Sequence, residues 1–186
     1  VSEWVAWSAA RFQAIFDEAL TAEGFDPALV KLVNGYGATG AAVVTGGCDQ
    51  VVFTGCLRNG RKVAHGAADA MIPCILELGG KDPFIVCEDA DLDRALHGLL
   101  VGTFINAGQN CLSSERILVH EAVYDRFEAM VVEVVEQLRC GPPLAGDRPD
   151  VGGVISPLQL DLVEALVNGA VEEGATVAVG GKRLHE

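Results

Sequence analysis

The stretch Val51–Gly60, with the sequence VVFTGCLRNG, changes from an apolar run to a polar run that ends in a glycine. Its first residues, Val51–Phe53, are β-branched or aromatic and favour a buried strand. A helical pattern follows at Asn59–Ala70, and Ile72–Leu78 is a second short apolar run. The order strand, helix, strand is typical of two parallel strands joined by a crossover helix, so this stretch predicts an α/β fold.

The residues before this unit continue the alternation of helices and strands. Apolar residues recur at helical spacing through Trp4–Leu20, and Gly24 then supplies a stop. We expect a strand at Leu29–Val33 and a helix at Ala38–Val44. The N-terminal part of the chain therefore extends the predicted parallel sheet.

The same alternation continues after the glycine pair at positions 79 and 80. We expect strands at Phe84–Cys87, Arg116–His120 and Ala175–Val179, and helices at Leu92–Phe104, Ala122–Leu138 and Pro157–Glu173. The stretch Gly141–Pro149 contains three prolines and is expected to be a loop. The second half of the chain is therefore also predicted to be α/β.

Charge and cysteine content exclude several classes of partner. The 186 residues include 13 basic and 26 acidic side chains, and a net charge of -13 repels nucleic acid and anionic lipid alike. The apolar runs are too short for a transmembrane span, and we expect no signal peptide and no membrane partner. The six cysteines form no CxxC pair and no Cys/His cluster, so we expect no metal site and a reducing, cytoplasmic setting.

Cys111 ends the stretch Asn106–Cys111, in which small and polar residues follow an apolar helical pattern. This context exposes a thiol instead of packing it. A thiol reacts mainly as its thiolate, which a helix N-terminus, a cation or a nearby base stabilises. The alternative is that a cysteine serves as a small core residue, and we expect this role for the other five. These are Cys48, Cys56, Cys74, Cys87 and Cys140.

Glu77 is a carboxylate near the end of an otherwise apolar strand, directly before Leu78 and the glycine pair. Such a carboxylate is either paired or functional, and a desolvated one could take a proton from water. The alternative is an ion pair with Lys81 or Arg94. The four histidines lie in no motif with Cys111, so a Cys/His hydrolase has little local support.

Two glycine-rich turns could bind an anion. Phe53–Gly60 joins a strand to a helix, which leaves backbone N–H groups at the helix start free for a pyrophosphate. Asn34–Gly40 is a second turn of this kind. Phe53–Gly60 lacks the GxGxxG pattern, and the alternative for both turns is simple chain reversal.

Taken together, these segments resemble the aldehyde dehydrogenase superfamily. Glu77–Lys81 resembles the family's glutamate signature, and Phe104–Arg116 resembles its cysteine signature, with Cys111 34 positions after Glu77. The resemblance implies that Cys111 forms a thiohemiacetal and then a thioester with an aldehyde, and that Glu77 activates the water that releases a carboxylic acid. It implies a cofactor site formed by Glu3, Gly37, Gly40, Phe53, Gly55, Cys56, Gly60 and Gln159.

NAD is the expected cofactor, because Glu3 would repel the 2′-phosphate of NADP. NADP is the possible alternative. By the resemblance, residues 1–79 are part of a Rossmann-like dinucleotide-binding domain and residues 80–186 part of an α/β catalytic domain. The chain would then be a central fragment of a homo-oligomeric enzyme, inactive alone, with sheet edges and apolar faces exposed. An acyltransferase or hydrolase that uses the same cysteine, and a non-catalytic binding module, are the competing hypotheses.

Overall fold

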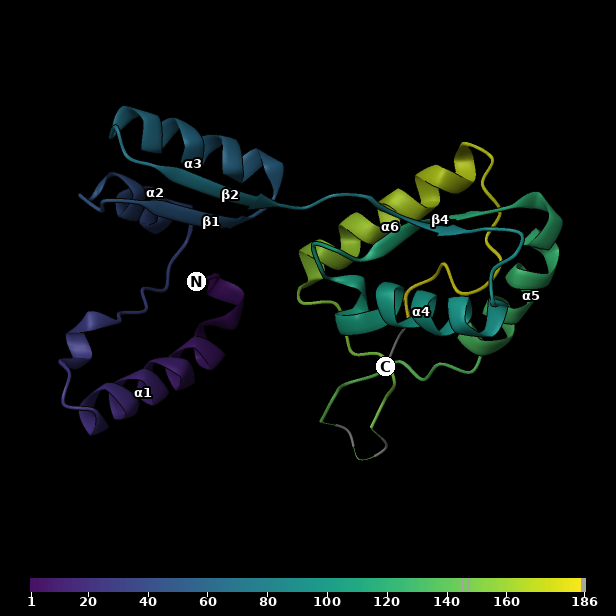
Figure 1. Cartoon of the computed structure of the whole chain (residues 1–186), viewed down its shortest axis with the longest axis horizontal. Helices are drawn as coiled ribbons and strands as arrows, with labels where there is room; N and C mark the ends of the chain where they lie inside the picture. Colours follow the sequence, from purple (N-terminus) through teal and green to yellow (C-terminus); the bar gives the residue numbers. More distant parts are fainter. Residues whose placement is uncertain (145, 147, 185–186) are drawn as a thin grey trace. The chain divides into compact units, whose positions relative to one another are not determined.

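The computed structural model describes residues 1–144, 146 and 148–184 (Figure 1). The chain divides into two compact units, Val1–Leu78 and Gly79–Glu186, and each contains a pair of parallel strands. Of the predicted loop Gly141–Pro149, residues 145 and 147 lie outside the described residues. The predicted α/β class is confirmed in both units.

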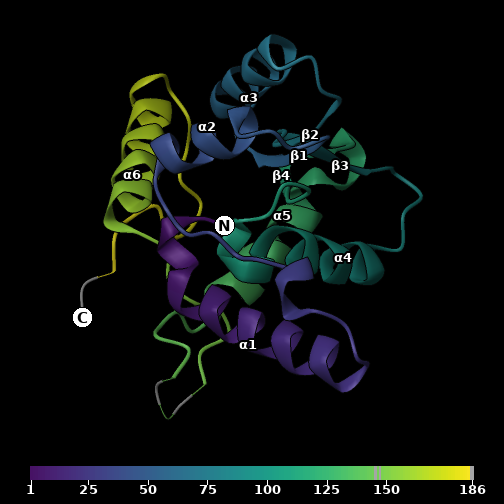
Figure 2. The same ribbon diagram turned by 90° about the vertical axis from the view of Figure 1, so that its left-hand side faces the viewer.

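The first unit is built around a strand, helix, strand motif. β1 (Val51–Gly55) and β2 (Cys74–Leu78) pair in parallel, and α3 (Leu57–Asp69) joins them. Figure 2 shows α3 running along one side of the strand pair. The first predicted unit is therefore confirmed, with ends that differ by one or two residues.

The packing of α3 against β2 depends on Gly60. This glycine is buried, and a Cβ atom added to it would lie 2.6 Å from Cδ2 of Leu78. A contact that short cannot form unless the Leu78 side chain shifts, so the lack of a side chain at position 60 lets the helix approach the strand this closely.

Helix α1 (Ala6–Ala22) and the short helices η1 (Glu3–Val5), η2 (Pro27–Leu29) and α2 (Gly37–Thr45) complete the unit. The predicted strand at Leu29–Val33 is wrong. The amide of Gln13, on α1, donates to Val30 O over 2.9 Å and accepts from Leu32 N over 2.6 Å. The backbone groups that a neighbouring strand would use are therefore bonded to a side chain.

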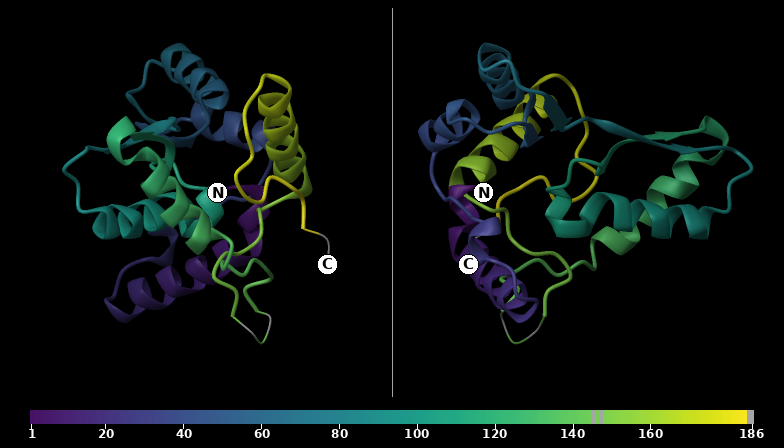
Figure 3. Two further views of the ribbon diagram at one scale, coloured as in Figure 1. Left: turned by 90° about the vertical axis from the view of Figure 1, so that its right-hand side faces the viewer. Right: turned by 60° about the vertical axis from the view of Figure 1, so that its left-hand side comes forward.

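The second unit holds β3 (Asp82–Val86) and β4 (Ser114–Val119), parallel with an irregularity between Asp82 and Pro83. The remaining elements are α4 (Leu92–Phe104), η3 (Ile105–Gly108), η4 (Glu121–Val123), α5 (Tyr124–Val135) and α6 (Pro157–Glu172). Helices α4 and α5 pack side by side (Figure 3).

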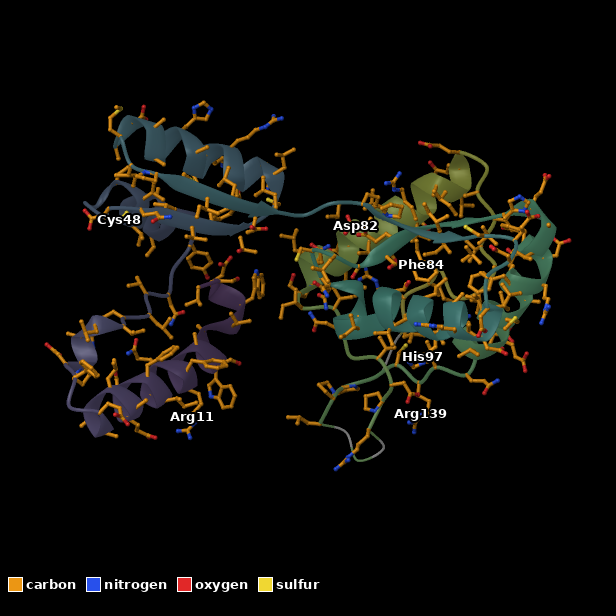
Figure 4. The ribbon with its side chains drawn as sticks, in the orientation of Figure 1. Arg11, Cys48, Asp82, Phe84, His97 and Arg139 are labelled. Atoms are coloured by element: carbon orange, nitrogen blue, oxygen red, sulfur yellow. The ribbon has the colours of Figure 1, made fainter. Side chains whose placement is uncertain are left out.

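The core of the second unit is formed by Val86, Leu92, Leu99 and Phe127. The side chain of Phe84 extends from β3 toward α4 and packs against this cluster (Figure 4). The core therefore fixes α4 beneath the strands and determines where the chain leaves the helix at Phe104.

The predicted strand at Ala175–Val179 is also wrong. Ala175 N donates to Ala170 O over 2.9 Å, and Gly174 has a φ of +101°, so these residues close the C-terminal end of α6. A strand also needs a neighbour with which to exchange backbone hydrogen bonds, and among the described residues β3 and β4 pair only with each other.

Several apolar side chains are exposed, as expected for faces that pack against further structure. Val52 and Ile75, on the open face of the first strand pair, are 65% and 47% exposed, and Trp7 on α1 is 88% exposed. Apolar side chains exposed in this way favour self-association. Aggregation of the chain when expressed alone stays a prediction.

Candidate active site

A cavity of about 970 Å³ lies in the first unit. Its wall is formed by β1, by α2 and the turn before it, by the part of α3 from Asn59 to Gly66, and by the residues around η1. The volume is at the upper end of the range of roughly 300–1,000 Å³ that is usual for ligand pockets. The wall includes six of the predicted cofactor residues, namely Glu3, Gly37, Gly40, Phe53, Gly55 and Cys56.

Two helix N-termini open onto this cavity. Tyr36 and Cys56, both within the described chain, are the N-caps of α2 and α3 and have no capping hydrogen bond from their side chains. The first two N–H groups of a helix have no acceptor within it, and they lie at the positive end of the helix dipole, whereas Thr39 N and Asn59 N donate to the carbonyls of these N-caps. This arrangement suits an anion such as a pyrophosphate.

The cavity wall also carries one side chain of each charge. Ser2 Oγ donates to Glu3 Oε2 over 3.5 Å, and Trp4 N donates to Ser2 Oγ over 3.3 Å, so Ser2 caps η1 beside the carboxylate. A carboxylate accepts hydrogen bonds from sugar hydroxyls. Lys62 lines the same cavity and did not emerge from the sequence. Lys62 follows Asn59 by three positions on one helix, so the sequence could have indicated that the two side chains lie on the same face.

Two predicted cofactor residues lie elsewhere. Gly60 is not part of the cavity wall, because it lies on the side of α3 that faces Leu78 of β2. Gln159 is exposed in the first turn of α6, where its backbone N–H donates to Ser156 Oγ over 3.2 Å. Gln159 belongs to the second unit, and its contact with a cofactor stays a prediction.

The turn before Cys111 has an unusual backbone. Asn106 (φ 53°, ψ 32°) and Ala107 (φ 57°, ψ 35°) are both left-handed, and Gly108 follows with a φ of 71°. Left-handed backbone costs roughly 1–2 kcal/mol per residue that has a Cβ, although asparagine tolerates it better. Such strain persists only where surrounding contacts hold it, and it is common at functional sites.

Side-chain hydrogen bonds close the base of this turn. Ser113 is 1% exposed, and its Oγ donates to Gly108 O over 3.1 Å. Thr103 Oγ1, at the end of α4, donates to Ser114 O over 2.9 Å. Cys111 is exposed above this base, with its Sγ 3.7 Å from Asn110 Oδ1. The turn therefore presents the thiol on the surface of the second unit.

Exposure alone does not single out Cys111. Cys56, Cys87 and Cys140 are also exposed, so their predicted role as core residues is wrong. Each lies outside a helix or strand: Cys56 is at the N-cap position of α3, Cys87 follows the end of β3, and Cys140 forms an isolated bridge with Val151. Cys48 and Cys74 are half-buried.

Glu77 lies on β2 opposite Thr54, on the open face that also carries Val52 and Ile75. It is exposed in the first unit, whereas Cys111 belongs to the second. Its role as a base and its alternative pairing with Lys81 or Arg94 both stay predictions.

The residues after the glycine pair are tied to those that follow the cysteine turn. Arg116 Nε donates to Lys81 O over 2.7 Å, and Asp82 N donates to Glu115 Oε2 over 2.9 Å. Asp82 stands at the start of β3 (Figure 4). Within the second unit, the ends of the two predicted signatures are therefore joined by direct hydrogen bonds.

No three His, Cys, Asp or Glu side chains are grouped to hold a metal ion within residues 1–144, 146 and 148–184. In the same part of the chain, no helix has both the length and the apolar character needed to cross a bilayer.

Comparison with known proteins identifies the family. The family model described as the aldehyde dehydrogenase family matches residues 1–186. The chain belongs to the aldehyde dehydrogenase family. An aldehyde dehydrogenase of Agaricus bisporus is 37% identical to this chain over 98% of the chain's length. A 3,6-anhydro-alpha-L-galactose dehydrogenase of a Vibrio species is 39% identical over 88% of it.

Solved structures of aldehyde dehydrogenases share its fold. A glyceraldehyde-3-phosphate dehydrogenase of Methanocaldococcus jannaschii, complexed with NADP, matches 94% of the chain at 35% identity with a TM-score of 0.88. A betaine aldehyde dehydrogenase of Staphylococcus aureus, in complex with NAD+, matches 83% at 36% identity with a TM-score of 0.79. The matches cover 38% and 31% of those two chains.

This aldehyde dehydrogenase chain spans about a third of the length of the curated relatives that it matches. It covers 36% of the Agaricus protein and 34% of the Vibrio protein.

Proposed function

We propose that this chain forms part of an enzyme that oxidises an aldehyde to a carboxylic acid with NAD(P). The observation that supports this most is the cavity of the first unit, whose wall joins Glu3, the two glycine-rich turns and Cys56 from separate parts of the sequence. These residues were expected together only for a dinucleotide-dependent enzyme, and the two competing hypotheses do not require them.

The residues of the cavity fit a dinucleotide. The first turns of α2 and α3 would hold the pyrophosphate through backbone N–H groups. Glu3 would accept hydrogen bonds from ribose hydroxyls and would disfavour a 2′-phosphate, so NAD is the proposed cofactor. NADP stays possible because Lys62 also lines the cavity and would partly offset the carboxylate.

The proposed chemistry uses two side chains. The Cys111 thiolate adds to the aldehyde carbon, forms a thiohemiacetal and holds the acyl group as a thioester once it is oxidised. When bound, NAD(P) supplies the acceptor for the hydride that leaves this carbon. Glu77 takes a proton from water, which attacks the thioester, releases the carboxylic acid and returns the thiol.

We further propose that residues 1–79 belong to the dinucleotide-binding domain and residues 80–186 to the catalytic domain. The substrate would be a small aldehyde, and the complete protein would be a cytoplasmic homo-oligomer. The two compact units support this division, since their boundary falls beside the predicted one.

The test is the absorbance of NADH when the complete protein that carries this chain is mixed with NAD and a panel of aldehydes. Cys111→Ala should abolish NADH formation. Glu77→Gln should leave one burst of NADH per active site and block further turnover, because the thioester forms but is not hydrolysed. Cys87→Ala is the matched control, because Cys87 is an exposed cysteine of the same unit and lies outside both signatures.

Each outcome separates the hypotheses. NADH formation that survives Cys111→Ala would exclude this cysteine as the nucleophile. Turnover in Glu77→Gln that requires coenzyme A or phosphate would indicate transfer of the acyl group instead of hydrolysis. No NADH from any aldehyde would leave the fold without its proposed activity.

A further inference from the structure

The side chain of Gln109 joins the cysteine turn to a segment more than 40 residues further along the chain. Its Oε1 accepts from Ile155 N over 2.8 Å. Its Nε2 donates to Asn106 O over 3.0 Å and, at the longer distance of 3.5 Å, to Gly153 O. Both ends of one amide are therefore bonded to main-chain atoms, some within the turn and some outside it.

These contacts act on the strained part of the turn. Asn106 returns a hydrogen bond from its Nδ2 to Gln109 O over 3.0 Å, so the two side chains brace each other's backbone. The left-handed residues Asn106 and Ala107 lie directly inside this brace. Because a left-handed alanine is unfavourable by itself, the brace supplies contacts that hold it.

The far side of the contact is also well fixed. Ile155 directly precedes Ser156, which is buried and caps α6 by accepting from Gln159 N over 3.2 Å. Gln109 is therefore anchored to the start of a sixteen-residue helix, and not to a free loop.

We propose that Gln109 is a positioning residue, which clamps the turn Asn106–Cys111 to Gly153–Ile155 and thereby fixes where the Cys111 thiol stands. The inference rests on the proposed function for its kinetic consequence. A small displacement of a nucleophile lowers the rate of the chemical step far more than it weakens binding, so the clamp should affect kcat and not KM.

The test compares Gln109→Met with Gln137→Met in the complete protein that carries this chain. Methionine keeps the length of glutamine but removes both hydrogen-bonding atoms of the amide. Gln137 is exposed in the same unit, and its Nε2 donates locally to Glu133 O, so it is a matched control. In Gln109→Met, kcat should fall by about tenfold to a hundredfold, with KM for aldehyde and NAD within about threefold.

A second substitution separates positioning from a loss of stability. Ala107→Gly removes the Cβ that makes the left-handed turn unfavourable, so the double variant should recover at least about threefold of the lost kcat. Because glycine also relieves strain in the folded state, denaturant unfolding of each variant is measured beside kcat, and a loss of kcat that only follows the loss of unfolding free energy would mark a purely structural role.

Amide exchange tests the clamp without any need for activity. The Ile155 N–H should exchange about tenfold faster in Gln109→Met than in the unsubstituted protein, because its acceptor is gone. Its exchange rate should be unchanged in Gln137→Met. Unchanged exchange, or a kcat within about twofold of the unsubstituted protein, would overturn the inference. No NADH from the unsubstituted protein would overturn the proposed function and the kinetic role together, while exchange would still decide the clamp.

Discussion

The close approach of α3 to β2 gives a prediction with a built-in comparison. In Gly60→Ala, the new methyl group would lie 2.6 Å from Leu78 Cδ2, whereas in Gly98→Ala on α4 it would lie 3.7 Å from Phe84 Cε2. Both changes gain about 1 kcal/mol from helix propensity. Only the first adds an overpacking cost of about 1–3 kcal/mol, because 3.7 Å is an ordinary contact.

The expected balance is a loss of about 0–2 kcal/mol for Gly60→Ala and a gain of about 1 kcal/mol for Gly98→Ala. Hydrogen exchange measured peptide by peptide reports each helix separately. Since ~1.4 kcal/mol corresponds to about tenfold, α3 should exchange up to about thirtyfold faster in the first variant. Helix α4 should exchange about fivefold more slowly in the second.

The comparison cancels the propensity gain, so the difference between the two variants reports packing alone. If Gly60→Ala slowed exchange in α3 as much as Gly98→Ala slows it in α4, Leu78 would have moved aside without cost. Gly60 would then not be required for the close approach of α3 to β2.

Three further predictions concern the core, a surface ion pair and the cofactor. Phe127→Ala, at a side chain that is 1% exposed, should destabilise the second unit by about 3–5 kcal/mol, measured by denaturant unfolding. Hydrogen bonds from Arg139 lower the pKa of Asp150 from 3.8 to about 2, so the contribution of this pair to stability is present above pH 3.8 and is lost as the pH falls through about 2. A carboxyl titration by NMR should give that midpoint, and Arg139→Met should raise it. Glu3→Gln should weaken NAD binding by about tenfold to a hundredfold and narrow the preference over NADP, measured by calorimetry, since a charge-assisted hydrogen bond contributes about 1.5–3 kcal/mol. A preference for NAD that does not change would remove Glu3 from the ribose site.

Local sequence patterns were enough for the elements that are defined by their own residues. Leu92–Phe104 is a helix with the predicted bounds, because Asp91 caps it and its apolar residues recur at helical spacing. The pair β1 and β2 was predictable because two short apolar runs flank a helical pattern. The family was recognisable for the same reason, since its two signatures are continuous stretches around Glu77 and Cys111.

The strands at Leu29–Val33 and Ala175–Val179 could not be judged in this way, because an apolar run becomes a strand only beside a partner. In the first case Gln13 takes the backbone groups, and in the second the closure of α6 does. The prediction that Cys56, Cys87 and Cys140 are buried was wrong for a similar reason, since burial depends on residues far away in the sequence and not only on residue type.

The candidate site likewise has features that the sequence predicts and features that only the tertiary structure determines. The kinds of residue needed for thiol chemistry and for anion binding could be read from the sequence, because each is a property of a side chain or of a short turn. That Glu3, Gly37 and Phe53 share one cavity wall, that Gly60 is used for packing, and that Gln109 reaches Ile155 depend on contacts between segments far apart in the chain. Such contacts are set by the path of the backbone in three dimensions, which local residue patterns do not record.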